Sequence, residues 1–324
     1  MVLLNLRKLN EIDKFLSPTR LLPNSYNTVE NRLRITKVLA YCLNLVIPSV
    51  LIPIFIVYTL SDQLRTYLGI IIVVCILTLY AFACFFVLQY SNYDKEKYLI
   101  QPHIKVEDQN MPPFDKYRLE YCTECLSFKM NRSYHFKKMG ACIYKFDHYC
   151  KWLGIVINYS NYKVFLLYTF AHTVNCTIIF VVSLYRLVNV DRFFGLSIFF
   201  LALTAGFVLA LVSLLALHIR FIMRNETTFE YLNYRWLRKN DKKNSIVYNP
   251  ILVSDDNGDL IYINISDCHR IFDRNSLYTN IVDAVGSLRL WTLFLPTLNT
   301  YDSLNLEVSK TIEEKYSKPM KNIV

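Results

Sequence analysis

The sequence predicts an all-α polytopic membrane protein, with four transmembrane helices and a cytosolic cysteine-rich domain between the second and the third helix. Hydrophobic residues make up 53% of the 324 residues and charged residues only 19%, a balance more apolar than that of soluble globular chains. Charged residues are absent from four stretches that are each long enough to cross about 30 Å of hydrocarbon as a helix. These stretches are residues 38–60, 66–89, 164–185 and 193–217.

Residues 1–37 form an N-terminal arm with seven Lys or Arg and three acidic residues. The first predicted helix, 38–60, contains Pro48 and Pro53, which we expect to kink it. Membrane helices tolerate prolines where neighbouring groups satisfy the freed carbonyls. A short turn leads to the second helix at 66–89, so the two helices should form an antiparallel hairpin. A pair of buried helices in a soluble protein is the alternative, but such helices seldom stay charge-free for more than about twenty residues.

The cysteine-rich domain occupies residues 90–163, which are polar and basic, and its core extends over 122–165. The second helical pair follows at 164–185 and 193–217, joined by a short connection that contains charged residues. Residues 218–324 form a basic C-terminal tail with the composition of a soluble segment. The predicted order is therefore arm, helical hairpin, cysteine-rich domain, helical hairpin and tail.

The net charge of +10 is distributed unevenly along the chain. The arm, the cysteine-rich domain and the tail contain nearly all of the Lys and Arg, whereas the two short loops within the helical pairs contain three. The positive-inside rule therefore predicts a multi-pass integral membrane protein with both termini and the cysteine-rich domain in the cytosol. A basic inner surface attracts anionic membrane lipid, which explains the charge without a nucleic-acid partner.

The cysteine-rich domain contains residues at metal-ligand spacing. Three cysteines and one histidine follow one another there, at Cys122, Cys125, His135 and Cys142. Ligands of this kind, with the first two on a short turn, suit a tetrahedral zinc ion. A redox pair is the usual alternative for a lone C-x-x-C, but the added histidine and third cysteine favour structural zinc. Such an ion stabilises a region that has little core of its own.

The run Asp147-His148-Tyr149-Cys150 places a carboxylate, an imidazole and a thiol close together. A neighbouring imidazole increases the fraction of a cysteine that is present as the nucleophilic thiolate. The carboxylate would fix the tautomer of the imidazole and stabilise its charged form. A chance juxtaposition or a second metal site fits the same four residues, so the residues alone leave catalysis open.

Taken together, this segment resembles the cysteine-rich domain of the DHHC protein S-acyltransferases (palmitoyltransferases), in the D-H-Y-C variant found among fungal members. The matching residues within the domain are Cys122, Cys125, Lys129, Arg132, His135, Cys142, Asp147, His148, Cys150, Trp152, Asn161 and Phe165. Beyond the domain, Thr227-Thr228-Phe229-Glu230 resembles the T-T-x-E motif of that family, and Asn280 with Gly286 resembles its C-terminal motif. The resemblance extends over residues 38 to 290 and includes the four-helix layout.

The resemblance also implies how many metal ions the domain holds. Members of the family bind two zinc ions through two interleaved sets of three cysteines and one histidine, and the first set corresponds to the four ligands above. The second set falls on Phe136, Met139, Tyr149 and Val156. None of these is an ordinary zinc ligand, so we expect one structural zinc ion and apolar packing in place of the other. Tyr149 then replaces a zinc ligand, and His148 corresponds to the catalytic histidine of the family.

The implied reaction is S-acylation of proteins in two half-reactions. Cys150 attacks the thioester of a long-chain acyl-CoA, with palmitoyl-CoA as the expected donor, and the acyl group passes to cysteines of proteins at the cytosolic membrane surface. His148 is expected to act as general base, Asp147 to orient it, and Thr228 to contact that carboxylate. Basic residues expected to meet the CoA phosphates are Lys145, Lys151, Arg220 and Arg224, although each also fits an ordinary interface anchor.

Two other functional classes compete with an acyltransferase. A catalytically silent zinc-binding membrane scaffold would also keep one metal site, and loss of the second metal site is an argument for this alternative. Retention of Asp147, His148, Cys150 and the T-T-x-E residues together favours the enzyme. A channel or transporter is disfavoured, because the predicted helices have few ionisable residues and the chain has no internal repeat.

Overall fold

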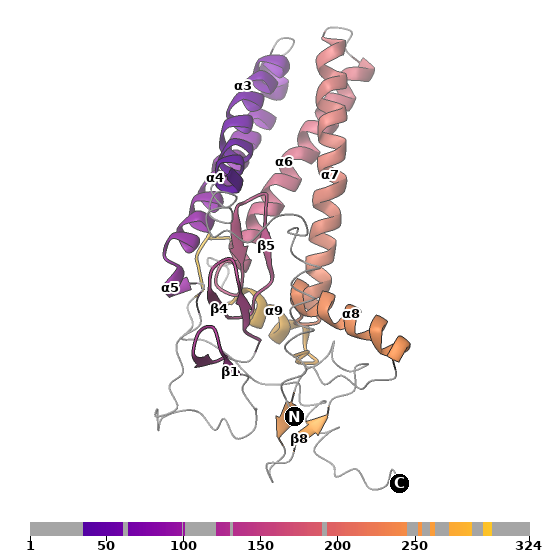
Figure 1. The fold of residues 1–324 in the computed structure, drawn as a ribbon. Helices are drawn as coiled ribbons and strands as arrows, with labels where there is room; N and C mark the ends of the chain where they lie inside the picture. Colours follow the sequence, from indigo (N-terminus) through magenta and orange to yellow (C-terminus); the bar gives the residue numbers. More distant parts are fainter. Residues whose placement is uncertain are drawn as a thin grey trace.

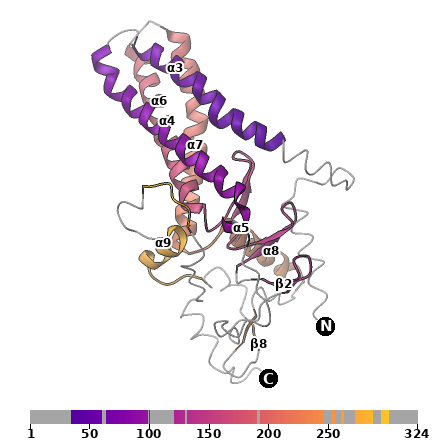
Figure 2. The same ribbon diagram turned by 90° about the vertical axis from the view of Figure 1, so that its left-hand side faces the viewer.

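The computed structural model describes most of the helical and cysteine-rich parts of the chain. The described residues are 35–60, 64–98, 100, 121–129, 132–189, 193–244, 252–254, 260–262, 272–286 and 294–299. The long helices form a bundle, and short hairpins with the shorter helices, among them α5 (Lys95–Tyr98), gather at one end of it (Figures 1 and 2). Residues 1–34 of the N-terminal arm and about half of the C-terminal tail lie outside the described residues.

Within the described residues, four helices are long and apolar enough to cross a membrane, which confirms the predicted fold class. The first spans Ile35–Thr59, and its later part is α3 (Ile47–Leu60). The other three are α4 (Leu64–Tyr93), α6 (Tyr162–Asn189) and α7 (Phe194–Met223). Each continues a few residues beyond its charge-free stretch on at least one side, because a membrane helix does not have to end where the hydrocarbon ends.

The first helix contains a π-helical turn, η1 (Cys42–Val46), just before Pro48. Ile47 N–H donates to the carbonyl of Cys42, five residues back. Proline lacks an N–H and crowds the preceding turn, and helices relieve such strain by local widening. The turn carries buried Asn44, whose Nδ2 donates to the carbonyl of Trp152 at 2.8 Å and whose Oδ1 accepts from Tyr168 Oη. The distortion therefore ties this helix to the cysteine-rich domain.

The described part of the cysteine-rich domain contains three antiparallel two-stranded hairpins, which were not predicted from the sequence. Their strands are β1 (Tyr121–Cys122) with β2 (Ser127–Phe128), β3 (Tyr134–Phe136) with β4 (Ala141–Ile143), and β5 (His148–Cys150) with β6 (Ile155–Ile157). A further pair, β7 (Leu252–Ser254) with β8 (Leu260–Tyr262), lies in the tail. Strands this short gain little from their own ladders, so side-chain packing and metal ligation must hold them.

The turn of the β5–β6 hairpin packs tightly on the first helix. Gly154 has φ +67°, and a Cβ built there would lie 3.3 Å from Cα of Lys37 and 3.4 Å from the carbonyl of Thr36. Glycine adopts this backbone conformation without the steric penalty of other residues. The hairpin that carries Cys150 therefore packs against the start of the first helix, at the end of the bundle where the cysteine-rich domain lies.

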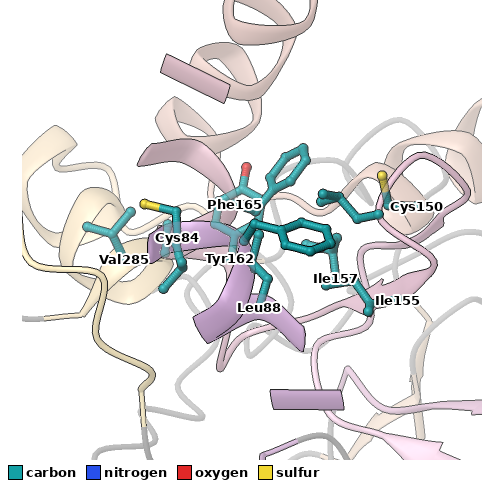
Figure 3. Close-up of a cluster of buried hydrophobic side chains, with 12 residues drawn as sticks. Cys84, Leu88, Cys150, Ile155, Ile157, Tyr162, Phe165 and Val285 are labelled. Carbon is teal, nitrogen blue, oxygen red and sulfur yellow. The ribbon is translucent and has the colours of Figure 1, made fainter. Parts of the chain in front are cut away.

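The main core joins this hairpin to the helices. Figure 3 shows the cluster, in which side chains from α4, α6, the hairpin and the short helix α9 (Leu277–Val285) meet. Its buried members are Cys84, Phe85, Leu88, Cys150, Leu153, Ile155, Ile157, Tyr162, Val164, Phe165, Ala284 and Val285. A second core, near the far end of the bundle, packs Phe55, Tyr58 and Phe200 with apolar residues of α4 and α6. Cys150 thus belongs to a continuous core and not to a mobile loop.

Candidate active site and metal centre

Four predicted ligands converge into a cluster that could hold a metal ion. Cys122 ends β1, Cys125 lies in the following turn, and His135 in β3 faces Cys142 in β4 as its register partner. Their ligand atoms all lie within 4.8 Å of one another. His135 Nδ1 lies 3.4, 3.2 and 3.8 Å from the sulfurs of Cys122, Cys125 and Cys142. In a tetrahedral zinc site, a nitrogen ligand and a sulfur ligand lie about 3.6 Å apart. The observed distances are close to this value, so the four residues fit a zinc ion.

The four positions of the missing second set also come together, as an apolar cluster. Phe136 and Val156 are buried in it, and Met139 and Tyr149 pack against them. The rings of Phe136 and Tyr149 stack with centroids 5.9 Å apart, and Tyr149 pairs with Val156 across the β5–β6 hairpin. Aromatic and aliphatic side chains therefore occupy the position that ligands would otherwise surround, as the sequence analysis expected.

Strand alternation separates the roles of neighbouring residues in β5. Successive side chains of a strand point to opposite faces. Tyr149 therefore lies on the face toward the apolar cluster, where its hydroxyl is 3.1 Å from Thr36 Oγ1. His148 and Cys150 share the other face, and Cys150 is packed into the main core with 8% of its surface exposed. The structure thus brings the predicted base and the predicted nucleophile to one side of one strand.

Asp147 is the predicted orienting residue, and it contacts His148 directly. His148 Nδ1 lies 2.6 Å from Asp147 Oδ2, and the backbone N–H of Asp147 donates to Ile157 O at 2.9 Å. Burial by itself would lower the pKa of His148, but the hydrogen bonds to Asp147 and Cys150 outweigh it and raise that pKa to about 10. These contacts therefore stabilise the imidazolium that forms when His148 takes the proton of Cys150.

The T-T-x-E residues form the N-terminus of α8 (Thr228–Asn244) and reach the same carboxylate. Thr228 N–H donates to Asp147 Oδ1 at 2.8 Å, and Thr228 Oγ1 donates to Asp147 Oδ2 at 2.9 Å. A helix N-terminus favours a negative charge placed there. Burial opposes ionisation of Asp147, but the bonds to His148 and Thr228 prevail and hold its pKa below the usual value.

The same motif is a helix capping box. The N–H of Glu230 donates to Thr227 Oγ1 at 3.1 Å, and the N–H of Thr227 donates to Glu230 Oε2 at 2.8 Å. This reciprocal pair satisfies two backbone donors that the first turn of a helix leaves free. Thr227 and Glu230 therefore fix the start of α8, and Thr228 between them is aimed at Asp147.

Arg132 links that cap to the cysteine-rich domain. Its Nε and Nη2 donate to the two carboxylate oxygens of Glu230 at 2.6 and 2.7 Å, and its Nη1 donates to Asn225 Oδ1 at 3.0 Å. Such a bidentate pair fixes orientation as well as distance. From the sequence, Arg132 was recognised only as a residue that matches the family, because a partner 98 positions away leaves no local signal.

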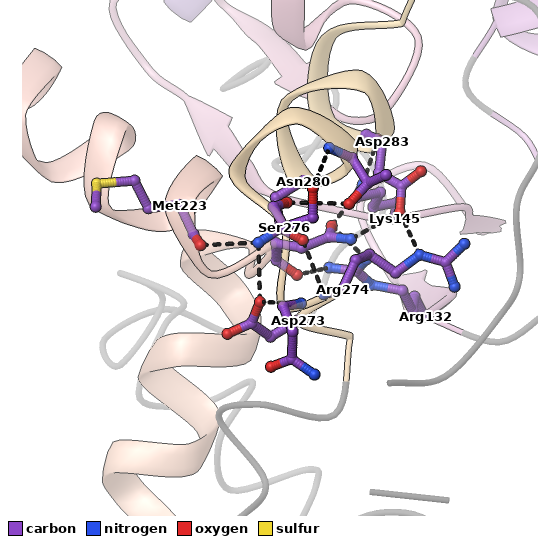
Figure 4. Close-up of polar contacts among 11 residues, drawn as sticks. Arg132, Lys145, Met223, Asp273, Arg274, Ser276, Asn280 and Asp283 are labelled. Atoms are coloured by element: carbon purple, nitrogen blue, oxygen red, sulfur yellow. Dashed lines mark hydrogen bonds and ion pairs between the residues drawn. The ribbon is translucent and has the colours of Figure 1, made fainter. Parts of the chain in front are cut away.

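Asn280 performs a similar anchoring task at the end of α7. Its Nδ2 donates to the carbonyl of Met223 and to Asp273 Oδ1, both at 2.9 Å (Figure 4). The last carbonyls of a helix lack internal partners, so this side chain joins α9 to the terminus of α7. Gly286 ends α9 with φ +83°.

His218 and Tyr162 are site residues that the sequence analysis missed. His218 lies on α7 with its ring centroid 6.2 Å from that of His148, and its Nδ1 is 2.9 Å from Tyr162 Oη. The charge-free stretch ended at residue 217, one position earlier. An ionisable residue directly after an apolar run was the signal that the sequence offered.

The four basic residues expected to meet CoA phosphates are placed differently from one another. Lys151 and Arg220 are exposed, and Arg224 is half-buried. Lys145 is buried, and its Nζ donates to Asp283 O at 2.7 Å and Asn225 Oδ1 at 3.2 Å (Figure 4). Burial and then the charge of Arg132 lower the pKa of Lys145 to about 7. Its amine therefore serves internal acceptors.

Comparison with known proteins identifies the domain that contains this site. A sequence model described as DHHC palmitoyltransferase matches residues 115–235. The chain is 25% identical over 246 residues to palmitoyltransferase PFA5 of Kluyveromyces lactis, which covers 70% of this chain and 69% of the relative. Palmitoyltransferase PFA5 of Saccharomyces cerevisiae is 28% identical over 187 residues, or 53% of this chain and 48% of that protein.

A vertebrate protein shows the same similarity over the central part. Palmitoyltransferase ZDHHC15A of Danio rerio is 32% identical over 122 residues, which cover 36% of this chain and 37% of the relative. The last two alignments therefore span half or less of the relatives' own length. Residues 115–235 of this chain therefore match the DHHC palmitoyltransferase family, and the relatives named here are palmitoyltransferases.

Proposed function

We propose that this chain is a protein S-acyltransferase that carries the acyl group on Cys150. The observation that supports it most is the hydrogen bond of 2.6 Å between Asp147 and His148. His148 begins strand β5, which also carries Cys150 and packs it against the helical bundle. Carboxylate, imidazole and thiol in this order can generate a nucleophilic thiolate. The relatives' names give the same class of reaction.

In the first half-reaction, the proton of Cys150 passes to His148 and the thiolate attacks the thioester carbonyl of a long-chain acyl-CoA. The carbon–sulfur bond to CoA breaks, and His148 returns the proton to the departing CoA thiolate. The acyl group is then joined to Cys150 as a new thioester. Asp147, held by Thr228, stabilises the imidazolium form of His148 during this exchange.

In the second half-reaction, His148 takes the proton from a cysteine of an acceptor protein. The acceptor thiolate attacks the acyl carbonyl, the bond to Cys150 breaks, and the proton returns to the Cys150 sulfur. The same base serves both steps because each exchanges one thioester for another. The acceptors are proteins at the cytosolic membrane surface that have accessible cysteines.

The position of Cys150 suits a substrate with a long acyl chain. The surrounding cluster includes Leu88 of α4 and Phe165 of α6, both from helices long and apolar enough to span (Figure 3). Each buried methylene contributes about 0.8 kcal/mol, so a palmitoyl chain between the helices would bind strongly. Palmitoyl-CoA is therefore the proposed donor, and exposed Lys151 and Arg220, with Arg224, are the proposed contacts of its phosphates. Lys145, the fourth expected contact, is buried and donates to Asp283 and Asn225.

The proposed metal is one structural zinc ion held by Cys122, Cys125, His135 and Cys142. When bound, it joins the β1–β2 turn to the β3–β4 hairpin and supplies folding free energy. The apolar cluster around Phe136 and Tyr149 supports a single ion, because it supplies packing where other family members have ligands.

The proposed orientation places both termini and the active site in the cytosol, next to anionic lipid. Support comes from the positive-inside rule and from the net charge of +10. Accessibility of single cysteines introduced in the arm and in the two short loops, measured on sealed vesicles, tests this arrangement. Labelling of the loops from the cytosolic side would refute it.

The proposed activity is tested by incubating the purified full chain with a clickable palmitoyl-CoA analogue. The wild type should acquire a label that hydroxylamine removes, because hydroxylamine cleaves thioesters. The Cys150→Ser variant should acquire none. Cys84→Ser is the matched control, since Cys84 is buried in the same cluster, and it should label like the wild type. Equal labelling of wild type and Cys150→Ser would exclude Cys150 as the acyl carrier, and absence of any label would favour the silent scaffold.

A further inference from the structure

A second histidine lies beside the proposed base and has no role in the reaction described above. His218 comes from α7, 70 positions from His148 in the sequence, and only 2% of its surface is exposed. The two imidazole rings lie with centroids 6.2 Å apart and an interplanar angle of 36°. Buried histidines are unusual enough in an apolar helix to need a physical reason.

His218 is held firmly in this position. Its Nδ1 shares a hydrogen bond of 2.9 Å with the hydroxyl of Tyr162 on α6. Its ring also meets Phe165 edge-on at 5.1 Å and Phe221 at 5.8 Å. One hydrogen bond and two aromatic contacts together fix both the place and the tilt of the imidazole.

The base itself needs such support. The hydrogen bond from Nδ1 to Asp147 fixes one edge of the His148 ring, and the tilt of the ring about that edge depends on the side chains packed against it. Transfer of the Cys150 proton requires the opposite nitrogen to stay aimed at the sulfur. Phe165 contacts the His148 ring edge-on at 5.5 Å, and His218 is the other described ring partner of His148.

We propose that His218, anchored by Tyr162, is a positioning residue for the base His148. The inference rests on the proposed acyl transfer at Cys150. A polar ring at position 218 suits this task better than another phenylalanine, because His148 becomes a buried cation during the reaction. The dipole of a neutral imidazole stabilises that cation in a region of low dielectric, whereas a second cation there would repel it.

The chain supplies a matched control for a buried histidine. His172 on α6 is half-buried, with its ring centroid 4.5 Å from that of Tyr168, and its buried Nε2 has no hydrogen-bond partner among the described residues. None of its described ring contacts includes His148 or Phe165. Replacement of either histidine by phenylalanine exchanges an imidazole for a ring of similar shape, but only one of the two faces the base.

The test measures single-turnover formation of the acyl-enzyme and the dependence of its rate on acyl-CoA concentration. His218→Phe should lower the maximal rate about tenfold or more, as displacement of a catalytic group typically does, and should leave the half-saturating concentration unchanged. His172→Phe should react like the wild type. His218→Asn should recover most of the rate, because its amide group takes the place of Nδ1 and can still bond to Tyr162.

Tyr162→Phe is a second test of the positioning role, and it can be made even if a histidine variant does not fold. It should lower the rate, and the loss should not add to that of His218→Phe in the double variant, because both changes disturb one unit. Metal content and acyl-CoA binding should stay at wild-type values in every variant.

Three results overturn the proposal. They are a wild-type rate for His218→Phe, an equal loss for His172→Phe, and full additivity of the Tyr162 and His218 changes. Absence of a Cys150 adduct in the wild type would instead refute the proposed function, and this inference with it. A labelled wild type with an unaffected His218→Phe refutes the inference alone.

Discussion

Replacement of Thr228 by valine tests how the start of α8 supports the active site. Asp147 accepts from Thr228 N–H at 2.8 Å, from Thr228 Oγ1 at 2.9 Å and shares a 2.6 Å bond with His148. Valine has the shape of threonine without the hydroxyl, so it removes the second bond and leaves the backbone bond in place. Asp147 is 2% exposed, so water replaces the lost donor poorly.

The size of the effect follows from that geometry. A hydrogen bond to a buried charge contributes about 1.5 to 3 kcal/mol, and about 1.4 kcal/mol corresponds to a factor of ten in rate. Part of the loss falls on the ground state, because Asp147 is ionised before the reaction as well as during it. We therefore expect acyl-enzyme formation to slow by about tenfold, and by at most about a hundredfold.

The stability of the fold should change with pH in a matching direction. The pKa of Asp147 is lowered in the folded protein. Its contribution is therefore present above the unfolded pKa and is lost as the pH falls through the folded pKa. Valine removes one cause of the lowered pKa, so the variant should lose stability at a higher pH than the wild type on acidification.

The assay is single-turnover labelling of Cys150 with a clickable acyl-CoA, together with thermal unfolding between pH 7 and acid. Thr228→Ser is the matched control, because it keeps the hydroxyl, and it should retain a rate within about threefold of the wild type. A wild-type rate for Thr228→Val would refute the role given to this hydroxyl. Equal losses for serine and valine would point to the lost methyl group instead.

Three further predictions concern the surrounding structure. Elemental analysis should find one zinc ion per chain, with its loss in Cys142→Ser and lower thermal stability after chelation; two tightly held ions would contradict the apolar replacement of the second site. Arg132→Lys should lower stability by about 1 to 3 kcal/mol with metal content unchanged, because lysine cannot reproduce the bidentate contact with Glu230; unaltered unfolding would contradict it. Burial and the nearby Glu230 raise the pKa of Glu226 to about 7. As the pH rises toward 7, the free energy of unfolding of the wild type should therefore fall by about 1 to 3 kcal/mol relative to that of Glu226→Gln. A difference between the two proteins that does not change with pH would refute this.

The sign of the Glu226 prediction follows from its surroundings. Neither carboxylate oxygen has a hydrogen-bond partner among the described residues, and the side chain is buried. A carboxyl group in such a place is more stable with its proton. The folded pKa lies above the unfolded one, so its contribution is present below the unfolded pKa and is lost as the pH rises through the folded pKa.

Patterns that are local in the sequence were sufficient for the helices and for the metal cluster. Charge-free stretches predict spanning helices because a bilayer penalises any exposed charge. The spacing from Cys122 to Cys142 predicts a common site because four soft ligands in a short segment have few other uses. The replacement of a zinc ligand by Tyr149 was expected from the family resemblance alone, and the strand alternation that turns Tyr149 away from His148 became visible only in the structure.

Contacts between distant segments could not be obtained in the same way. The capping box at Thr227 and Glu230 fits a recognisable pattern, but the pairing of Glu230 with Arg132 depends on how α8 meets the cysteine-rich domain. Burial of Lys145 has the same origin, because its acceptors come from α9 and from the end of α7. His218 was missed because helix α7 continues past the charge-free stretch, which ended at residue 217.

Mass-spectrometric mapping of the acyl group on the metal-loaded full chain, after incubation with palmitoyl-CoA, tests the account most directly. One acyl group should be found, on the peptide that contains Cys150, and it should disappear when a cysteine-containing acceptor protein at the membrane is added. An acyl group on another cysteine, or an unmodified chain that contains its metal, would contradict the assignment of Cys150 as the acyl carrier.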